Sequence, residues 1–125
     1  MANILTVDDQ LVIRRLLSTT LSSAKHEVHS CEDGMSAITF ARKNKVDLVI
    51  TDLNMPNISG DSLVRKLRSL EAYQNTPILV LTTESSEEKK QKLRDLGADG
   101  WIQKPFNPER LMKAVDRMLD KFGIK

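Results

Sequence analysis

This sequence of 125 residues has few cysteine and aromatic residues, and neither sign of charge dominates. Cys31 is the single cysteine, so an intramolecular disulfide is excluded, and this usage is typical of a reducing compartment. The formal net charge is only +2, and no cluster of Lys and Arg stands out that would follow a phosphate backbone. We therefore expect no binding to nucleic acid.

Long hydrophobic runs are also missing. The first residues, MANILTVDD, reach two aspartates too early for the apolar core of a signal peptide, and no run approaches the roughly 20 apolar residues of a membrane span. No linker, repeat or low-complexity tract divides the chain. We expect a monomeric cytoplasmic protein with no membrane span, in which residues 1–125 form a single domain.

Short apolar runs predict the strands of a sheet. Residues 4–7, 48–51 and 78–81 do not alternate with polar residues, as expected for parallel strands that are covered on both faces. Residues 26–29 and 100–103 are weaker and more polar candidates, which suits the two edges of the sheet.

Segments of helical period separate these runs. They cover residues 11–21, 34–43, 61–70, 86–96 and 108–122. Asn107 and Pro108 are a typical N-cap and first helical residue, and Gly97 stands where a helix end needs a left-handed residue. Five β-α repeats predict the α/β class: a flavodoxin-like (βα)5 three-layer sandwich whose parallel sheet has the order 2-1-3-4-5.

Polar side chains follow the predicted strands and are expected to meet at the carboxyl edge of the sheet. They are Asp8 and Asp9 after the first strand, Asp52 after the third, Thr82 and Thr83 after the fourth, and Lys104 after the fifth. Three neighbouring carboxylates repel one another, and their pKa values rise unless a cation neutralises them. Hard oxygen ligands without His or Cys favour Mg²⁺ over zinc.

Each of these residues also has a simpler interpretation. Asp8 and Asp9 are possible N-caps, Asp52 is a common way to start a turn, and a lone Lys104 is usually a solvated surface residue. Their joint placement favours phosphoryl transfer instead. An aspartate beside a metal ion, a hydroxyl and a lysine can act as a nucleophile and form an acyl phosphate.

At this point the whole sequence resembles the receiver domain of two-component response regulators, particularly the stand-alone CheY-type proteins. The matching residues are Val7-Asp8-Asp9, Asp52-Leu53-Asn54-Met55-Pro56, Gly60, Thr82, Trp101 and Lys104-Pro105-Phe106. The resemblance implies that Asp52 is the phosphoacceptor, which takes its phosphoryl group from a phosphohistidine of a histidine kinase. It also implies that Asp8, Asp9, Asp52 and the backbone carbonyl of Asn54 bind Mg²⁺.

A conformational switch is implied by the same resemblance. Thr82 and Lys104 would contact the phosphoryl group, and Thr82 would move toward it while the aromatic residue of the fifth strand, here Trp101, turns inward. Tyrosine or phenylalanine is commoner at that position, and relatives often carry a smaller residue than Thr83. A cis peptide bond is implied between Lys104 and Pro105.

Output in this family uses a face built from the fourth helix, the fifth strand and the fifth helix. The fourth predicted helix is very polar here, with acids early and bases late, so we expect an electrostatic contact with the unidentified downstream protein. Asn54 and Glu84 occupy positions from which their side chains would orient the hydrolytic water, so both are expected to tune dephosphorylation.

The predicted function is a phosphorylation-activated switch in chemotaxis-type two-component signalling. It is not a conventional enzyme, although self-phosphorylation from small donors and self-dephosphorylation are expected. The sequence ends soon after the last helix, so we expect no output domain. A phosphorelay intermediate and a phosphate sink are alternatives. An aspartyl-phosphate hydrolase is less favoured, because Asp8 and Asp9 are adjacent instead of spaced by one residue. A flavin carrier is also less favoured, because these two aspartates would repel the phosphate of the flavin.

Overall fold

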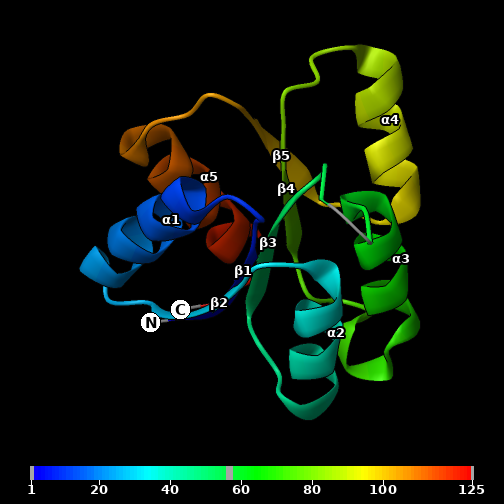
Figure 1. Cartoon of the computed structure of the whole chain (residues 1–125), viewed down its shortest axis with the longest axis horizontal. Coiled ribbons are helices and arrows are strands. Elements are labelled where there is room, and N and C mark those ends of the chain that lie inside the picture. Colours follow the sequence, from blue (N-terminus) through cyan, green and yellow to red (C-terminus); the bar gives the residue numbers. More distant parts are fainter. Residues whose placement is uncertain (1, 56–57, 125) are drawn as a thin grey trace.

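A five-stranded parallel sheet with helices on both faces accounts for residues 2–55 and 58–124, which the computed structural model describes (Figure 1). The elements are β1 (Asn3–Val7), α1 (Leu11–Ser23), β2 (Glu27–Cys31), α2 (Gly34–Lys43), β3 (Leu48–Asp52), α3 (Gly60–Ser69), the 3-10 helix η1 (Glu71–Tyr73), β4 (Ile78–Thr82), α4 (Glu87–Leu96), β5 (Gly100–Gln103) and α5 (Pro108–Lys121). The strand order is β2-β1-β3-β4-β5, which confirms the predicted flavodoxin-like fold.

Helices α1 and α5 cover one face of the sheet, and α2, α3 and α4 cover the other (Figure 1). Successive residues of a strand point to opposite faces. Leu48 and Ile50 therefore join the apolar cluster under α1 and α5, whereas Val49 joins the cluster under α2 and α3. All residues of β3 and β4 are buried, which explains their unbroken apolar runs. The edge strands β2 and β5 are partly exposed, as predicted.

Element boundaries differ little from the sequence prediction. Strand β2 is shifted toward Cys31, α1 continues to Ser23, and the single turn η1 was not predicted. The side chain of Asn107 caps α5 by accepting the backbone N–H of Arg110 at 2.9 Å, and Gly97 ends α4 with a φ of 113°. Within the described residues, none of the helices combines the length and the apolar character that crossing a membrane requires.

Candidate functional site

Three carboxylates meet at the carboxyl edge of the sheet. Val7 at the end of β1 lies opposite Thr51 in β3, so the residues that follow them in the chain are neighbours. Asp8, Asp9 and Asp52 each offer an oxygen atom, and these atoms all lie within 4.8 Å of one another. Asp8 is fully buried and Asp52 is 5% exposed, whereas Asp9 is open to solvent. The predicted convergence of these residues is therefore observed.

Lys104 provides the one ammonium group that contacts this cluster among the described residues. Its Nζ atom lies 3.0 Å from Oδ1 of Asp52 and 3.3 Å from Oδ2 of Asp8. The peptide bond to Pro105 is cis, as expected. One positive charge thus faces three negative ones, and the cluster keeps an excess of negative charge.

Burial and charge shift the pKa values of this pair. Burial raises the pKa of Asp52, and the charge of Asp8 raises it further, while the hydrogen bond from Lys104 opposes the rise without cancelling it. Burial alone would lower the pKa of Lys104, but the hydrogen bond to Asp52 and the charges of both carboxylates outweigh it and raise that pKa. Asp52 is therefore an ionisable group whose anion is poorly stabilised, and a further cation would stabilise it.

Residues at the start of α1 fix the position of Asp8. Its Oδ1 atom accepts the backbone N–H of Gln10 at 2.8 Å, and the guanidinium of Arg14 donates to its backbone carbonyl at 2.9 Å. The N-cap residue of α1 is Gln10, and its side chain makes no capping hydrogen bond. The alternative that Asp8 and Asp9 are N-caps is therefore not observed. Gln10 and Arg14 were not predicted, because neither carries a local signal in the sequence.

A hollow of about 300 Å³ opens beside Asp52. Its lining residues are Asp9, Gln10, Asp52, Asn54, Thr83 and Lys104. The β3–α3 loop forms one side, and Gly60 at the start of α3 lets this loop approach closely: a Cβ atom there would lie 2.5 Å from the carbonyl oxygen of Asp52. The backbone N–H of Gly60 also donates to the carbonyl of Leu53 at 2.7 Å. Pro56, part of the matching motif, lies outside the described residues.

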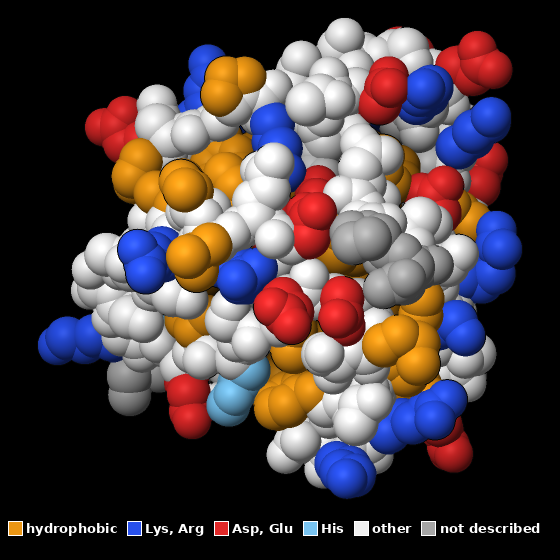
Figure 2. All heavy atoms as spheres, viewed as in Figure 1, with side chains coloured by type: hydrophobic (Ala, Val, Ile, Leu, Met, Phe, Trp, Pro, Cys, Tyr) orange, Lys and Arg blue, Asp and Glu red, His pale blue; other side chains and the backbone are white. Residues whose placement is uncertain are grey.

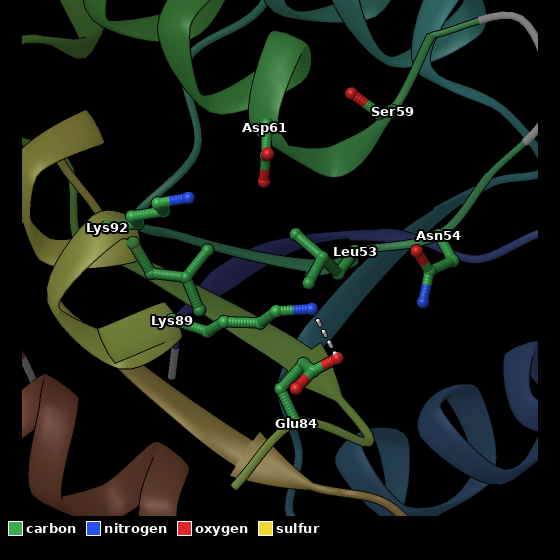
Figure 3. Close-up of a pocket in the computed structure, with 8 residues that line it drawn as sticks. Leu53, Asn54, Ser59, Asp61, Glu84, Lys89 and Lys92 are labelled. Atoms are coloured by element: carbon green, nitrogen blue, oxygen red, sulfur yellow. Dashed lines mark hydrogen bonds and ion pairs between the residues drawn. The ribbon is translucent and has the colours of Figure 1, made fainter. Parts of the chain in front are cut away.

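Thr82 is buried at the end of β4, and its hydroxyl oxygen accepts the backbone N–H of Glu84 at 3.0 Å. The side chain of Glu84 does not line the hollow beside Asp52. It lines a neighbouring hollow and pairs with Lys89, whose Nζ atom lies 2.9 Å from its carboxylate (Figure 3). Asn54 borders both hollows. Of the two residues expected to tune dephosphorylation, only Asn54 therefore lines the hollow beside Asp52.

Trp101 lies away from the acidic cluster, on the edge strand β5. Its ring is partly buried and contacts α4, where Lys90 and Arg94 place their cationic groups 5.4 and 4.8 Å from the ring centroid. Cations at such distances are attracted to the face of an indole. The structure therefore brings Trp101 together with the polar fourth helix, a contact that the sequence did not predict.

Charges of both signs and separate apolar groups are interspersed over the face seen in Figure 2. This mixture of signs on the face shown agrees with the formal net charge of only +2. On this face the acidic side chains are not gathered into one large acidic surface (Figure 2).

Comparison with known proteins identifies the family. The response regulator receiver domain matches residues 4–116. The chain is 35% identical to a chemotaxis protein CheY homolog of Campylobacter jejuni, over 93% of this chain and 91% of that protein. It is 34% identical to a gliding motility regulatory protein of Myxococcus xanthus, of which it spans only 15%.

Solved structures agree with this assignment. Chemotaxis response regulator CheY4 of Vibrio cholerae has a TM-score of 0.93 and 47% identity, with 95% of this chain and 99% of that chain covered. The receiver domain of a sensor histidine kinase from Pseudomonas aeruginosa, which holds a magnesium ion in its active site cleft, has a TM-score of 0.87 and 25% identity, with 95% and 98% covered. The receiver match decides against the hydrolase and the flavin carrier. The chain belongs to the response regulator receiver family, as a phosphorylation-activated switch of the CheY type.

Proposed function

We propose that Asp52 accepts a phosphoryl group from a phosphohistidine of a histidine kinase. The observation that carries this proposal is the meeting of Asp8, Asp9 and Asp52 within 4.8 Å, with Lys104 bonded to two of them. An oxygen of Asp52 forms a bond to phosphorus while the bond from phosphorus to the imidazole nitrogen breaks, and the electron pair leaves with the imidazole. The product is an acyl phosphate on Asp52.

Mg²⁺ is the cation that fits the donor set of this site. Asp8, Asp9, Asp52 and the backbone carbonyl of Asn54 would hold it through hard oxygen ligands. When bound, this cation neutralises charge on the carboxylates and on the phosphoryl oxygens. The excess of negative charge around Lys104 and the magnesium ion held by the P. aeruginosa receiver support the assignment.

Lys104 and Thr82 contact the phosphoryl group. Lys104 already points at Asp52 and neutralises a phosphoryl oxygen. The Thr82 oxygen accepts a hydrogen bond from Glu84, so its own proton remains free to be donated to the phosphoryl group. Movement of Thr82 toward the site is followed by Trp101, which leaves its contacts with α4 and turns inward.

The lifetime of the acyl phosphate and the choice of phosphodonor both depend on the site around Asp52. The hollow of about 300 Å³ beside Asp52 has room for a small phosphodonor and for water, so the chain phosphorylates itself from small donors and dephosphorylates itself with water. Asn54, which lines this hollow, orients that water, and Glu84 joins it only when its carboxylate leaves Lys89. The chain accordingly acts as a switch with intrinsic chemistry and not as a conventional enzyme.

The kinase and the downstream protein use different surfaces. Leu11 and Val12, which are 51% and 77% exposed at the start of α1, offer an apolar rim for the kinase next to the acidic cluster. The output face is built from α4, β5 and α5. Beside Trp101 it is lined by four basic residues of α5, namely Arg110, Lys113, Arg117 and Lys121. A downstream protein with an acidic contact surface suits this face.

The proposed setting is chemotaxis-type two-component signalling, in keeping with the names of the CheY relatives. Residues 1–125 act there as a single monomeric receiver domain whose output is a protein contact. The single free Cys31 suits the cytoplasm, where disulfides are rare.

Phosphorylation of substituted proteins tests the proposal. With Mg²⁺ and a small phosphodonor, the native chain should acquire an acid-labile, hydroxylamine-sensitive phosphoryl group, and Asp52→Asn should acquire none. Asp61→Asn is the matched control, because Asp61 lies in the neighbouring hollow and should leave labelling intact.

Persistent labelling of Asp52→Asn would move the phosphoryl group to another residue and overturn the proposal. The same samples test Trp101, the one tryptophan of the chain. Beryllofluoride with Mg²⁺ should change its fluorescence, and proven binding without any change would separate Trp101 from the switch.

A further inference from the structure

A second hollow of about 300 Å³ lies next to the phosphoryl site, between the β3–α3 loop and the start of α4 (Figure 3). Its lining residues are Leu53, Asn54, Ser59, Asp61, Glu84, Lys89, Lys92 and Leu93. Asn54 is shared with the hollow that contains Asp52. The two spaces therefore adjoin at Asn54.

Glu84 is tethered at two points in this second hollow. Its backbone N–H donates to the hydroxyl oxygen of Thr82 at 3.0 Å, which fixes its main chain to the end of β4. Its carboxylate accepts a hydrogen bond from the ammonium group of Lys89 at 2.9 Å, which directs the Glu84 side chain toward α4 (Figure 3). The charge of Glu84 is thereby used for a contact that faces away from Asp52.

Lys89 is itself anchored at the start of a helix. Its backbone N–H donates to the side chain of Ser86, the N-cap residue of α4, at 3.3 Å. From this fixed base its side chain reaches back to Glu84, which precedes the helix. The hydrogen bond to Glu84, with the charges of Glu84 and Glu88, raises the pKa of Lys89, so the ammonium stays charged near neutral pH.

We propose that Lys89 is a positioning residue that sets the lifetime of the acyl phosphate by holding the Glu84 carboxylate away from the hydrolytic water. The inference rests on the proposed function, in which Asp52 carries the phosphoryl group and Glu84 orients water. When the pair opens, the carboxylate turns toward Asn54 and accepts a hydrogen bond from the attacking water. When the pair is closed, Asn54 is left to orient that water alone.

The hydrolysis itself needs only water. The water oxygen forms a bond to phosphorus, and the bond between phosphorus and the Asp52 oxygen breaks. The electron pair returns to Asp52 as a carboxylate, and both protons of the water leave with inorganic phosphate. Glu84 is unchanged by the reaction, so its position affects only the rate.

Exposure limits the size of the effect. The side chains of Lys89 and Glu84 are 56% and 33% exposed, so the pair is screened by salt and opens readily. We expect removal of the Lys89 charge to speed loss of the phosphoryl group by about two- to fivefold, in line with the modest strength of exposed ion pairs. Lys89 thus adjusts the lifetime within a narrow range.

The test compares decay of the phosphorylated protein after the phosphodonor is removed, with Mg²⁺ present throughout. Lys89→Met, which keeps most of the side-chain length, should decay about two- to fivefold faster than the native chain. Lys89→Arg keeps the positive charge and should restore the native rate. Lys92→Met is the matched control, because Lys92 lines the same hollow from the same helix and has no ion pair among the described contacts.

Two further readouts separate positioning from a structural role. In a Glu84→Ala background, Lys89→Met should no longer change the decay rate. Rising NaCl should speed decay of the native chain toward the Lys89→Met rate and leave that variant nearly unaffected.

An unchanged or slower rate in Lys89→Met would overturn the inference, as would equal effects of Lys89→Met and Lys92→Met. An effect of Lys89→Met that persists without Glu84 would also overturn it, because the lysine would then act by another route. Failure of the native chain to form any acyl phosphate would instead contradict the proposed function, so the two failures are distinguishable.

Discussion

The two edges of the sheet, where its strands begin and where they end, treat charge in opposite ways. At the amino edge, the guanidinium of Arg68 donates to the carbonyl of Gly97 at 2.7 and 3.1 Å, to those of Tyr73 and Thr76 at 2.7 Å each, and to the carboxylate of Asp99 at 2.8 Å. The same Asp99 oxygen accepts the backbone N–H of Ile78 at 2.8 Å. These hydrogen bonds link α3 to η1, to the end of α4, to the start of β4 and to Asp99, which directly precedes β5.

The carboxyl edge, by contrast, has one ammonium for three carboxylates, and the anion of Asp52 is poorly stabilised there. The comparison teaches that this fold satisfies its charges completely where it needs stability and leaves them unbalanced where it needs a ligand. Functional sites commonly give up stability in this way.

The largest expected effect concerns Arg68. Arg68→Ala should lower the free energy of unfolding by about 3 kcal/mol, because it leaves the Asp99 carboxylate and several carbonyls without their donor. Urea unfolding measures the change. Arg65→Ala is the control, because Arg65 is exposed on the same helix and should change stability by less than about 0.5 kcal/mol. Equal losses in both variants would refute the claim that the amino edge carries this stability.

Gly60→Ala probes the carboxyl edge by sterics. The added Cβ would lie 2.5 Å from the backbone oxygen of Asp52, so the loop must shift, at a cost of about 1–3 kcal/mol. Phosphorylation should slow at the same time, because Asp52 is displaced. Gly100→Ala is the control: its Cβ would meet the Cε atom at the flexible end of the Met118 side chain, which can adjust. Normal phosphorylation of Gly60→Ala would show that the close approach is dispensable.

The smallest expected effect comes from replacing an aspartate by asparagine at each edge. This replacement should stabilise the fold at the carboxyl edge and destabilise it at the amino edge. Burial raises the pKa of Asp52 above its unfolded value, so its contribution to stability is present at acid pH and is lost as the pH rises. Without Mg²⁺ at pH 7, Asp52→Asn should therefore stabilise the fold by about 0.5–2 kcal/mol. Asp99→Asn should destabilise it, because it weakens the bond to Arg68.

Thermal unfolding of both variants at pH 7 and near pH 4 tests whether the two substitutions change the stability in opposite directions. The gain from Asp52→Asn should shrink at the lower pH, because the raised pKa lets more of the native carboxyl take up a proton there. Added Mg²⁺ should stabilise the native chain more than Asp52→Asn. Stabilisation of both variants, or of neither, would remove the proposed difference between the edges.

The sequence predicted the carboxyl edge far better than the amino edge, for a physical reason. The run before Asp52 is apolar because β3 is buried on both faces, and a carboxylate directly after such a run must stand at the sheet edge. This pattern can be recognised from a few consecutive residues of the sequence. Arg68 and Asp99 are ordinary charged residues 31 positions apart, and only the fold brings them together.

The same reasoning explains the details that were missed within the site. Asp8 and Asp9 fit two patterns equally well, an N-cap and a metal ligand, and only the geometry at Gln10 distinguishes them. The pairing of Glu84 with Lys89 depends on how the chain turns into α4, and the position of Trp101 depends on the packing of that helix. None of these choices is encoded by spacing alone.

Strand β3 is bonded to β1 on one side and to β4 on the other, and all five of its residues are buried. The strand is therefore held along its whole length, and Asp52 is its last residue. In the proposed function, a phosphoryl group on Asp52 leaves this strand in place, so neighbouring segments outside the sheet, such as residues 83–86 before α4, must accommodate it. The rigidity of the strand is thus what directs the signal outward, to the surface where another protein can read it.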